Sequence, residues 1–267
     1  MGTNIHQTAI VEEGASLGMN VTIGAYSCVG ANVQLGDNVE LKSHVVIGGS
    51  TRIGSGCRLF SFASIGQQPQ DLKFHGEDSW LEVGENNTIR EYVTMNPGTE
   101  GGGMVTRVGS NCMFMVGAHI AHDCAIGDGV IMANYASLGG HVYVGDNAII
   151  GGLAAVHQFV RIGSYAMIGG MSGVEQDVIP YGSVMGDRAT LCGLNIVGLK
   201  RRGFTRDIIR SMRDAYSQLF DSRGTLQDRA QQVRISYAKT KEVMDIVEFL
   251  SGETTRSFCL PREDRGS

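Results

Sequence analysis

An apolar residue returns at every sixth position through most of this 267-residue chain, as far as Val174. The series begins at Val11, breaks after Ile65, resumes at Val83 and runs without interruption from Val108. Glycine often follows the apolar residue, and the fifth position of each hexad is usually small or β-branched. A period of six matches neither the 3.6 residues of an α-helix nor the 2 of a β-strand. It is typical of hexapeptide repeats that wind into a parallel β-helix, with three hexads in each coil.

A repeat of this kind specifies a narrow prism. Large aliphatic side chains alternating with small ones fill its inside, and each coil buries its interior only by stacking on its neighbours. The composition agrees, since 42% of the residues are hydrophobic, 18% are charged and 38 are glycines. That glycine content is roughly twice the usual share of about 7%. We therefore expect a folded chain of mainly β class.

Two excursions leave the repeat, and we expect both to be loops. In residues 67–81 the apolar positions of the repeat are held by Asp71 and Glu77. The gap between Met95 and Val108 is 13 residues, where twelve would keep the phase. Loops that project from a rigid stack often carry function.

The repeat fades after Val174, and the apolar residues follow a helical period from Thr205 onward. Thr205 and Thr225 are suitable helix N-caps, and Gly252 suits the end of a last helix near residues 241–250. We predict two parts: a β-helix over residues 1–190 and a small α-helical C-terminal domain over residues 191–267.

Charge, cysteine content and hydropathy exclude several classes of protein. A net charge of −5 argues against a nucleic-acid binder, because such binding needs clustered Lys and Arg against phosphates. No uncharged run reaches the length of a membrane span, so stable membrane insertion is not expected. The six cysteines form no C-x-x-C pair, and the N-terminus has no signal-peptide pattern. These features predict a soluble cytoplasmic protein.

Polar residues gather on one edge of the predicted prism. A coil of three hexads has 18 residues, so His122, Gly140 and Gln158 form one column across three coils. Asp123 and His141 form the adjacent column, and His157 precedes Gln158. Neighbouring coils lie about 4.8 Å apart, so these side chains are expected to cluster.

Three interpretations of this cluster remain open on spacing alone. In the first, a neutral imidazole accepts a hydroxyl proton, Asp123 assists it, and the Gly140 N–H stabilises the oxyanion of an acyl transfer. In the second, three histidines bind a metal, as in zinc-type hydration enzymes. In the third, the polar side chains only solvate a corner.

Five segments carry a resemblance to a known family. They are Ala118–Cys124 (AHIAHDC), Leu138–Val142 (LGGHV), Ala155–Phe159 (AVHQF), Asn195–Arg202 (NIVGLKRR) and Gln70–Lys73 (QDLK). Together they resemble the UDP-N-acetylglucosamine O-acyltransferases of lipid A biosynthesis. The resemblance implies a homotrimeric left-handed β-helix that moves an (R)-3-hydroxyacyl group from acyl carrier protein to the glucosamine 3-hydroxyl of UDP-N-acetylglucosamine. It implies no metal and no cofactor, because the acyl group arrives on the phosphopantetheine of the carrier protein.

The same resemblance implies a role for each matching residue. His122 would be the general base with Asp123 assisting, the Gly140 N–H would bind the oxyanion, and His119 and His141 would line the sugar and acyl pockets. The implied substrate contacts lie elsewhere: Gln70, Asp71 and Lys73 on the sugar nucleotide from a neighbouring subunit; His157 and Gln158 in the sugar or acyl pocket; Asn195, Arg201 and Arg202 at the nucleotide end. Gly170 matches the position that measures acyl length, and its missing side chain implies a longer hydroxyacyl chain.

Two residues depart from the family pattern: Asn96 stands where some members have His, and Val197 where some have a carboxylate.

The alternative functions are the later N-acyltransferase of the same pathway, an acetyl-CoA-dependent sugar acetyltransferase, a γ-type carbonic anhydrase and a purely structural stack. A basic run, Lys200–Arg202 with Arg206, Arg210 and Arg213, suits an acidic carrier protein or a solvated helix face.

Overall fold

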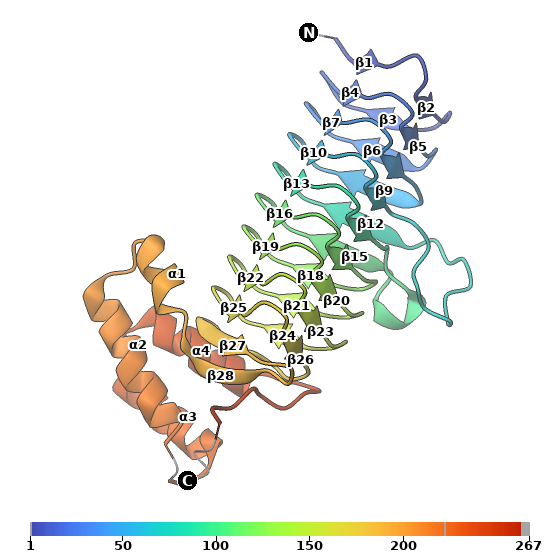
Figure 1. Cartoon of the computed structure of the whole chain (residues 1–267). Coiled ribbons are helices and arrows are strands. Elements are labelled where there is room, and N and C mark those ends of the chain that lie inside the picture. Colours follow the sequence, from blue (N-terminus) through green and yellow to red (C-terminus); the bar gives the residue numbers. More distant parts are fainter. Residues whose placement is uncertain (1, 222, 263–267) are drawn as a thin grey trace.

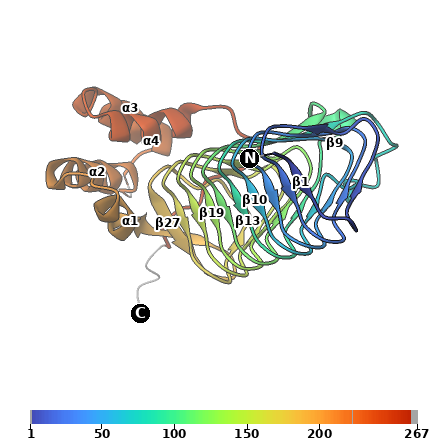
Figure 2. The ribbon, with the colours of Figure 1, turned by 90° about the horizontal axis from the view of Figure 1, so that it is seen from above.

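The computed structural model describes residues 2–221 and 223–262. A left-handed parallel β-helix forms a long prism, and four helices pack at its C-terminal end (Figure 1). Seen from above, the coils stack along one axis and the helices lie beyond the last of them (Figure 2). Within the described ranges, no helix combines the length and apolar character that crossing a membrane requires. The predicted fold class is confirmed.

Three sheets form the sides of the prism, and as far as β26 every third strand joins the same sheet. Sheet A contains β1 (Asn4–Ile5), β4 (Thr22–Ile23), β7 (Glu40–Leu41), β10 (Arg58–Leu59), β13 (Thr88–Ile89), β16 (Met113–Phe114), β19 (Ile131–Met132), β22 (Ile149–Ile150), β25 (Met167–Ile168), β27 (Gly182–Met185) and β28 (Thr190–Leu194). Sheet B contains β2 (Ile10–Val11), β5 (Cys28–Val29), β8 (Val46–Ile47), β11 (Ser64–Ile65), β14 (Thr94–Met95), β17 (His119–Ile120), β20 (Ser137–Leu138), β23 (Ala155–Val156) and β26 (Gly173–Val174). Sheet C contains β3 (Ser16–Leu17), β6 (Val33–Leu35), β9 (Ser50–Ile53), β12 (Trp80–Val83), β15 (Val105–Val108), β18 (Ala125–Ile126), β21 (Tyr143–Val144) and β24 (Arg161–Ile162).

The register of the sheets follows the hexad count. His119 pairs with Ser137, one coil of 18 residues later. The coil that holds the first excursion is longer, because Ser64 pairs with Thr94. The next coil holds the second excursion, which includes the helical turn η1 (Glu100–Gly102), and Thr94 pairs with His119. Both excursions therefore leave the prism without breaking the parallel pairing.

The core is the row of first and fifth hexad positions. The first-position residues Phe114, Ile120 and Met132 are 0% exposed, as are the fifth-position residues Ala118 and Val130. A large side chain and a small one at alternate positions fill the narrow interior at the density that protein cores require. The hexad pattern therefore predicted which side chains face inward.

The coils turn at three ridges, which we name by the sheets they join: ridge AB, ridge BC and ridge CA. One residue in most turns has a positive φ, for example Asp123 (φ 59) and His141 (φ 61) on ridge BC. This left-handed backbone conformation favours Gly, Asn, Asp and His. The same position of the turn therefore recurs at the surface of each ridge, once in every coil.

The C-terminal domain contains α1 (Ile196–Arg201), α2 (Arg206–Leu219), α3 (Leu226–Ser236) and α4 (Lys241–Ser251). The predicted N-caps are confirmed, since the hydroxyls of Thr205 and Thr225 accept from backbone N–H groups in the first turns of α2 and α3. Gly252 is the C-cap of α4, with an extended backbone (φ −72). The six-residue α1 was not predicted.

The last described residues fold back onto the end of the β-helix. Asp177 bridges Phe258 in parallel pairing, and its buried carboxylate accepts from Arg161 at 2.7 Å. β28 pairs antiparallel with β27 and is the last strand of sheet A. The expected boundary between residues 190 and 191 lies inside β28, so sheet A extends past it.

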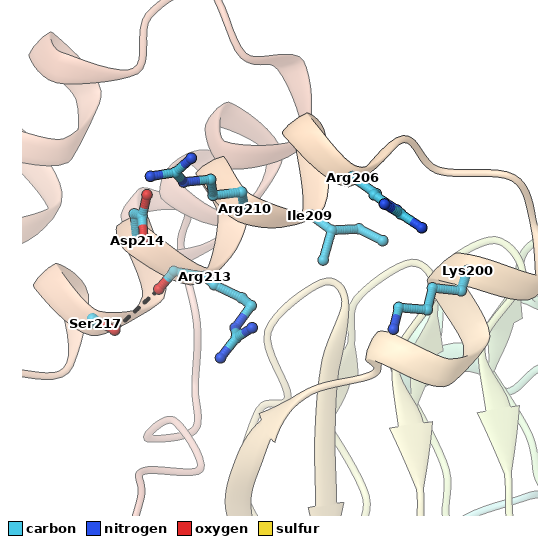
Figure 3. A pocket seen from close by; sticks show the side chains of 7 residues that line it. All are labelled: Lys200, Arg206, Ile209, Arg210, Arg213, Asp214 and Ser217. Atoms are coloured by element: carbon cyan, nitrogen blue, oxygen red, sulfur yellow. Dashed lines mark hydrogen bonds between the residues drawn. The ribbon is translucent and has the colours of Figure 1, made fainter.

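A basic pocket lies between α1 and α2 (Figure 3). Its lining residues are Lys200, Arg206, Ile209, Arg210, Arg213, Asp214 and Ser217. Four of these side chains are cationic and one is acidic, so four of the six basic residues singled out in the sequence line one pocket.

Candidate active site

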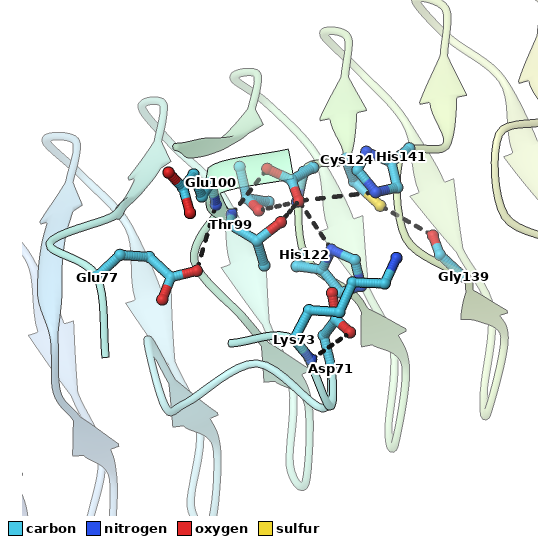
Figure 4. Close-up of polar contacts among 11 residues, drawn as sticks. Asp71, Lys73, Glu77, Thr99, Glu100, His122, Cys124, Gly139 and His141 are labelled. Atoms are coloured by element: carbon cyan, nitrogen blue, oxygen red, sulfur yellow. Dashed lines mark hydrogen bonds and ion pairs between the residues drawn. The ribbon is translucent and has the colours of Figure 1, made fainter. Parts of the chain in front are cut away.

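His122 and Asp123 form a hydrogen-bonded pair on ridge BC (Figure 4). The His122 Nδ1 atom lies 2.8 Å from Asp123 Oδ2, and the two side chains are 12% and 0% exposed. An ionised carboxylate only accepts hydrogen bonds, so Nδ1 carries the imidazole proton. The lone pair of His122 is then on Nε2, the atom positioned to accept a proton.

Gly140 lies directly beneath the His122 ring. A Cβ atom at position 140 would lie 2.5 Å from His122 Cε1 and 2.6 Å from Nε2, so a side chain there would displace the imidazole. Among the described residues, no acceptor is hydrogen-bonded to the Gly140 N–H. This site therefore offers a base and a free backbone donor side by side.

The predicted columns are confirmed by backbone hydrogen bonds between coils. His141 N donates to His122 O at 3.0 Å, and Phe159 N donates to Gly140 O at 3.0 Å. The His141 ring meets the His122 ring edge-on at 5.1 Å and stacks on Phe159 at 4.4 Å. Its Nε2 lies 3.9 Å from Asp123 Oδ2. Burial lowers the pKa of His141, although the Asp123 carboxylate opposes that shift.

His119 lies three residues before His122, on strand β17 of sheet B. Its Nδ1 lies 2.7 Å from the Thr94 hydroxyl. Burial, and then the nearby charge of a protonated His122, lower the pKa of His119. The lowered pKa favours a neutral His119 next to the His122–Asp123 pair.

The first loop places Asp71 and Lys73 beside the cluster formed by their own chain (Figure 4). Asp71 Oδ1 accepts from the backbone N–H of Lys73 at 3.0 Å. That hydrogen bond lowers the pKa of Asp71, and the charges of a protonated His122 and of Lys73 lower it further. Gln70 is exposed in the same loop. The loop thus supplies ionised and polar groups beside His122 (Figure 4).

Asn96 explains how this loop is held. Its Nδ2 donates to the carbonyl oxygens of Gln67 and Gln68, at 2.9 and 3.3 Å. The Asn96 side chain is 4% exposed, and a histidine ring would not reproduce both bonds in that geometry. The departure at position 96 therefore anchors the base of the first loop.

His157 and Gln158 differ in what they contact. Gln158 follows the column of Gly140 and is exposed. The His157 ring points to the C-terminal segment instead, with Nδ1 2.8 Å from Arg256 Nη2. The column arithmetic placed His157 correctly on ridge BC but gave no sign of its Arg256 partner.

The remaining expected substrate residues lie on the other two ridges. Gly170 is exposed in the turn between β25 and β26, on ridge AB. Asn195 caps α1 by accepting from Gly198 N, and its Nδ2 donates to Tyr165 O on ridge CA. Arg202 donates to Asn147 Oδ1 at 2.5 Å on the same ridge. One chain therefore presents these residues and His122 on three different ridges.

The geometry supports the metal interpretation less well than the general-base interpretation. The ligand atoms of His122, Asp123 and His141 lie within 4.8 Å of one another. However, both Asp123 oxygens already accept hydrogen bonds, and the Nδ1 of His119 faces Thr94. Asp123 and His119 are thus already engaged in hydrogen bonds.

Family profiles and full-length relatives match the sequence. The profile described as UDP N-acetylglucosamine O-acyltransferase, domain 2, covers residues 177–259, and that of bacterial transferase hexapeptide repeats covers residues 14–49 and 106–140. The acyl-[acyl-carrier-protein]–UDP-N-acetylglucosamine O-acyltransferase of Rickettsia canadensis is 53% identical over 257 residues, covering 96% of this chain and 97% of the relative. The chain belongs to this O-acyltransferase family.

Other members of the family agree. The Caulobacter vibrioides enzyme of the same name is 56% identical over 208 residues, covering 78% of this chain and 79% of the relative. The solved structure of the Campylobacter jejuni UDP-N-acetylglucosamine acyltransferase has a TM-score of 0.91 and 39% identity, covering 97% of this chain and 100% of that one. Membership of the family makes the chain an acyltransferase and sets aside the carbonic-anhydrase and purely structural alternatives.

Sequence reasoning missed several residues that touch the site. Thr99, Gly102 and Thr106 contact Asp123, Thr94 contacts His119, and Arg256 contacts His157. The extra residue in the gap between Met95 and Val108 was the available signal for Thr99 and Gly102. For Arg256, 99 residues from its partner, the sequence contained none.

Proposed function

We propose that this chain transfers an (R)-3-hydroxyacyl group from acyl carrier protein to the glucosamine 3-hydroxyl of UDP-N-acetylglucosamine, in the cytoplasm, with His122 as general base. The observation that carries the proposal is the His122–Asp123 pair, whose Nδ1 and Oδ2 atoms lie 2.8 Å apart. This pair lies over Gly140, where the His122 ring leaves no room for a side chain. The names of the relatives supply the donor and acceptor.

The transfer proceeds through one tetrahedral intermediate. The acceptor O–H gives its proton to His122 Nε2 while its oxygen bonds to the thioester carbonyl carbon. The carbonyl electron pair moves onto oxygen, and the Gly140 N–H binds the resulting oxyanion. When the C=O bond re-forms, the C–S bond breaks, and the imidazolium proton passes to the phosphopantetheine thiolate. Asp123 stabilises the imidazolium between these two proton transfers.

The proposed substrate contacts follow the chemistry of the groups. Lys73, Arg201 and Arg202 suit the pyrophosphate and ribose end, because cationic donors pair with phosphate oxygens. His119, His141 and Gln158 provide neutral donors and acceptors for sugar hydroxyls. Gly170 leaves space for a long acyl chain, since a Cβ there would meet only the backbone of Gly152, at 3.3 Å.

A homotrimer is proposed because the parts of the site lie apart in one chain. His122 on ridge BC, Gly170 on ridge AB and Asn195 beside ridge CA face three directions. A three-fold axis would bring a ridge of one copy against a different ridge of the next. The proposal therefore places each site between two neighbouring copies.

The carrier protein is proposed to dock at the basic pocket of Figure 3. Lys200, Arg206, Arg210 and Arg213 gather there, and the chain as a whole carries a net charge of −5, so this surface is a local exception. Complementary charge steers an acidic partner into place more than it sets the final affinity.

The test replaces His122 by Gln, which keeps the size and polarity of the side chain but removes the base. With hydroxyacyl carrier protein and UDP-N-acetylglucosamine, we expect kcat to fall by at least about 100-fold. His6→Gln, at the exposed N-terminal coil, is the control. Near-normal turnover by His122→Gln would refute the base. Preference for a 3-amino over a 3-hydroxyl acceptor in direct competition would refute the O-acyl assignment.

A further inference from the structure

The second excursion from the repeat closes over the carboxylate of Asp123. Thr99 donates to both carboxylate oxygens: its backbone N–H lies 2.9 Å from Oδ1 and its hydroxyl 2.6 Å from Oδ2. Thr99 is the N-cap residue of η1, yet its hydroxyl makes no cap hydrogen bond. The group that usually satisfies a helix N-terminus is directed at Asp123 instead.

The glycines of this loop have different surroundings. A Cβ on Gly102 would lie 1.9 Å from Asp123 Cγ and 2.3 Å from each carboxylate oxygen. A Cβ on Gly101 would meet no atom within 4 Å. The backbone of the loop therefore packs directly on the carboxylate, and only at position 102 does this packing require glycine.

The backbone of Asp123 is also held in place. The Asp123 backbone N–H donates to the Thr106 hydroxyl at 2.7 Å, and the residue has a φ of 59°. Its Oδ2 is shared by the Thr99 hydroxyl and His122 Nδ1. With the side chain 0% exposed, water does not replace a lost donor. Thr99 thus determines which way the Asp123 carboxylate faces His122.

This loop also meets the loop that carries Asp71 and Lys73. The backbone N–H of Glu100 donates to Glu77 Oε1 at 3.3 Å (Figure 4). Both excursions therefore converge on the His122–Asp123 pair, one beside the imidazole and the other over the carboxylate.

We propose that Thr99 and Gly102 form a carboxylate cap, a positioning device that orients Asp123 so that His122 keeps its proton on Nδ1 and its lone pair on Nε2. The proposal rests on the proposed role of His122 as base. Thr99 and Gly102 touch no reacting atom, so they act through Asp123.

The first test removes the hydroxyl. Thr99→Val is expected to lower kcat about 10-fold, because a hydrogen bond to a charged group is worth about a factor of ten or more. KM for the sugar nucleotide should change less than about 2-fold, and Thr99→Ser should restore kcat to within about 3-fold of wild type. Thr51→Val, at a buried threonine on β9 outside the site, is the matched control. An unchanged kcat, or an equal loss in Thr51→Val, would overturn the proposal.

A double-mutant cycle separates positioning from general structure. If Thr99 acts through the carboxylate, Thr99→Val should change the residual rate of Asp123→Ala by less than about 2-fold. If Thr99 had a purely structural role, Thr99→Val would lower the rate of the wild type and the residual rate of Asp123→Ala by the same factor, and that outcome would overturn the proposal. Gly102→Ala should lose activity as Thr99→Val does, and Gly101→Ala should not.

A spectroscopic measurement keeps this inference separate from the proposed function. The ¹⁵N chemical shifts of His122 should report one tautomer, with the proton on Nδ1, in the wild type and a mixture in Thr99→Val. If His122→Gln proves active, the base assignment fails while the shifts still test the cap. Identical shifts in the wild type and Thr99→Val would overturn the cap itself.

Discussion

Burial sets the protonation of the histidines around the pair. The pKa values of His119 and His141 are both lowered, in each case mainly because burial disfavours the charged imidazole. Both rings are therefore kept neutral at neutral pH and remain able to accept as well as donate hydrogen bonds. Two neutral imidazoles beside His122 also add no positive charge next to it.

The lowered pKa of His119 predicts a pH dependence of stability. The unfolded chain binds a proton near the ordinary histidine pKa of about 6.5, while folded His119 does not, so the free energy of unfolding rises with pH. Stability should fall as the pH drops from about 7 through 6.5, and level off below the lowered folded pKa. Thermal unfolding measured at pH 7.5 and at pH 5.5 should show that His119→Gln loses less stability between these two pH values than the wild type does. His75→Gln, exposed in the first loop, should match wild type, and an equal loss in all three proteins would contradict the assignment.

At the scale of elements, the hexad count predicted the strands, their order and the column on ridge BC. It succeeded because each coil of Val108–Val174 has the same length, so spacing in the sequence becomes height along the prism. It failed where the chain leaves the prism, since nothing in the period places Thr99 over Asp123 or Asp71 beside His122. The six-residue α1 escaped notice because its position is set by Asn195, whose side chain bonds Tyr165 30 residues away.

Helix α2 carries the prediction for the carrier protein. Arg210→Glu with Arg213→Glu should raise KM for the acyl carrier protein about 10-fold at low salt, because the reversed charge repels an acidic partner. KM for UDP-N-acetylglucosamine should stay the same, and added salt should narrow the difference between variant and wild type. Arg234→Glu, at a half-buried position on α3, is the control. An equal rise in KM for both substrates would mean that α2 binds the nucleotide or stabilises the fold instead.

On the scale of the whole molecule, ridge AB is an apolar line along the prism. Exposed apolar and aromatic side chains hold the repeated turn position in most coils: Tyr26 59%, Phe62 49%, Tyr92 57%, Tyr135 56%, Leu153 60% and Met171 75%. His44 and Gly117 hold the same position in the two coils between them. An extended row of exposed apolar side chains of this kind marks a protein–protein contact more often than a free surface. Because the line follows the coil axis, it suits a second copy lying parallel to the first.

A charge placed on this ridge tests the proposed trimer. Leu153→Glu should shift the particle from three chains to one in sedimentation or light scattering, because burying an unpaired carboxylate at a subunit contact costs several kcal/mol. Acyl transfer should fall with the trimer, since Gly170 and His122 stand on different ridges of one chain, whereas the β-helix should keep its circular dichroism. Met19→Glu is the matched control, because Met19 is 68% exposed on ridge CA near the N-terminal end. A fully active wild-type monomer, or a Leu153→Glu variant that assembles and turns over normally, would place the complete site within a single chain.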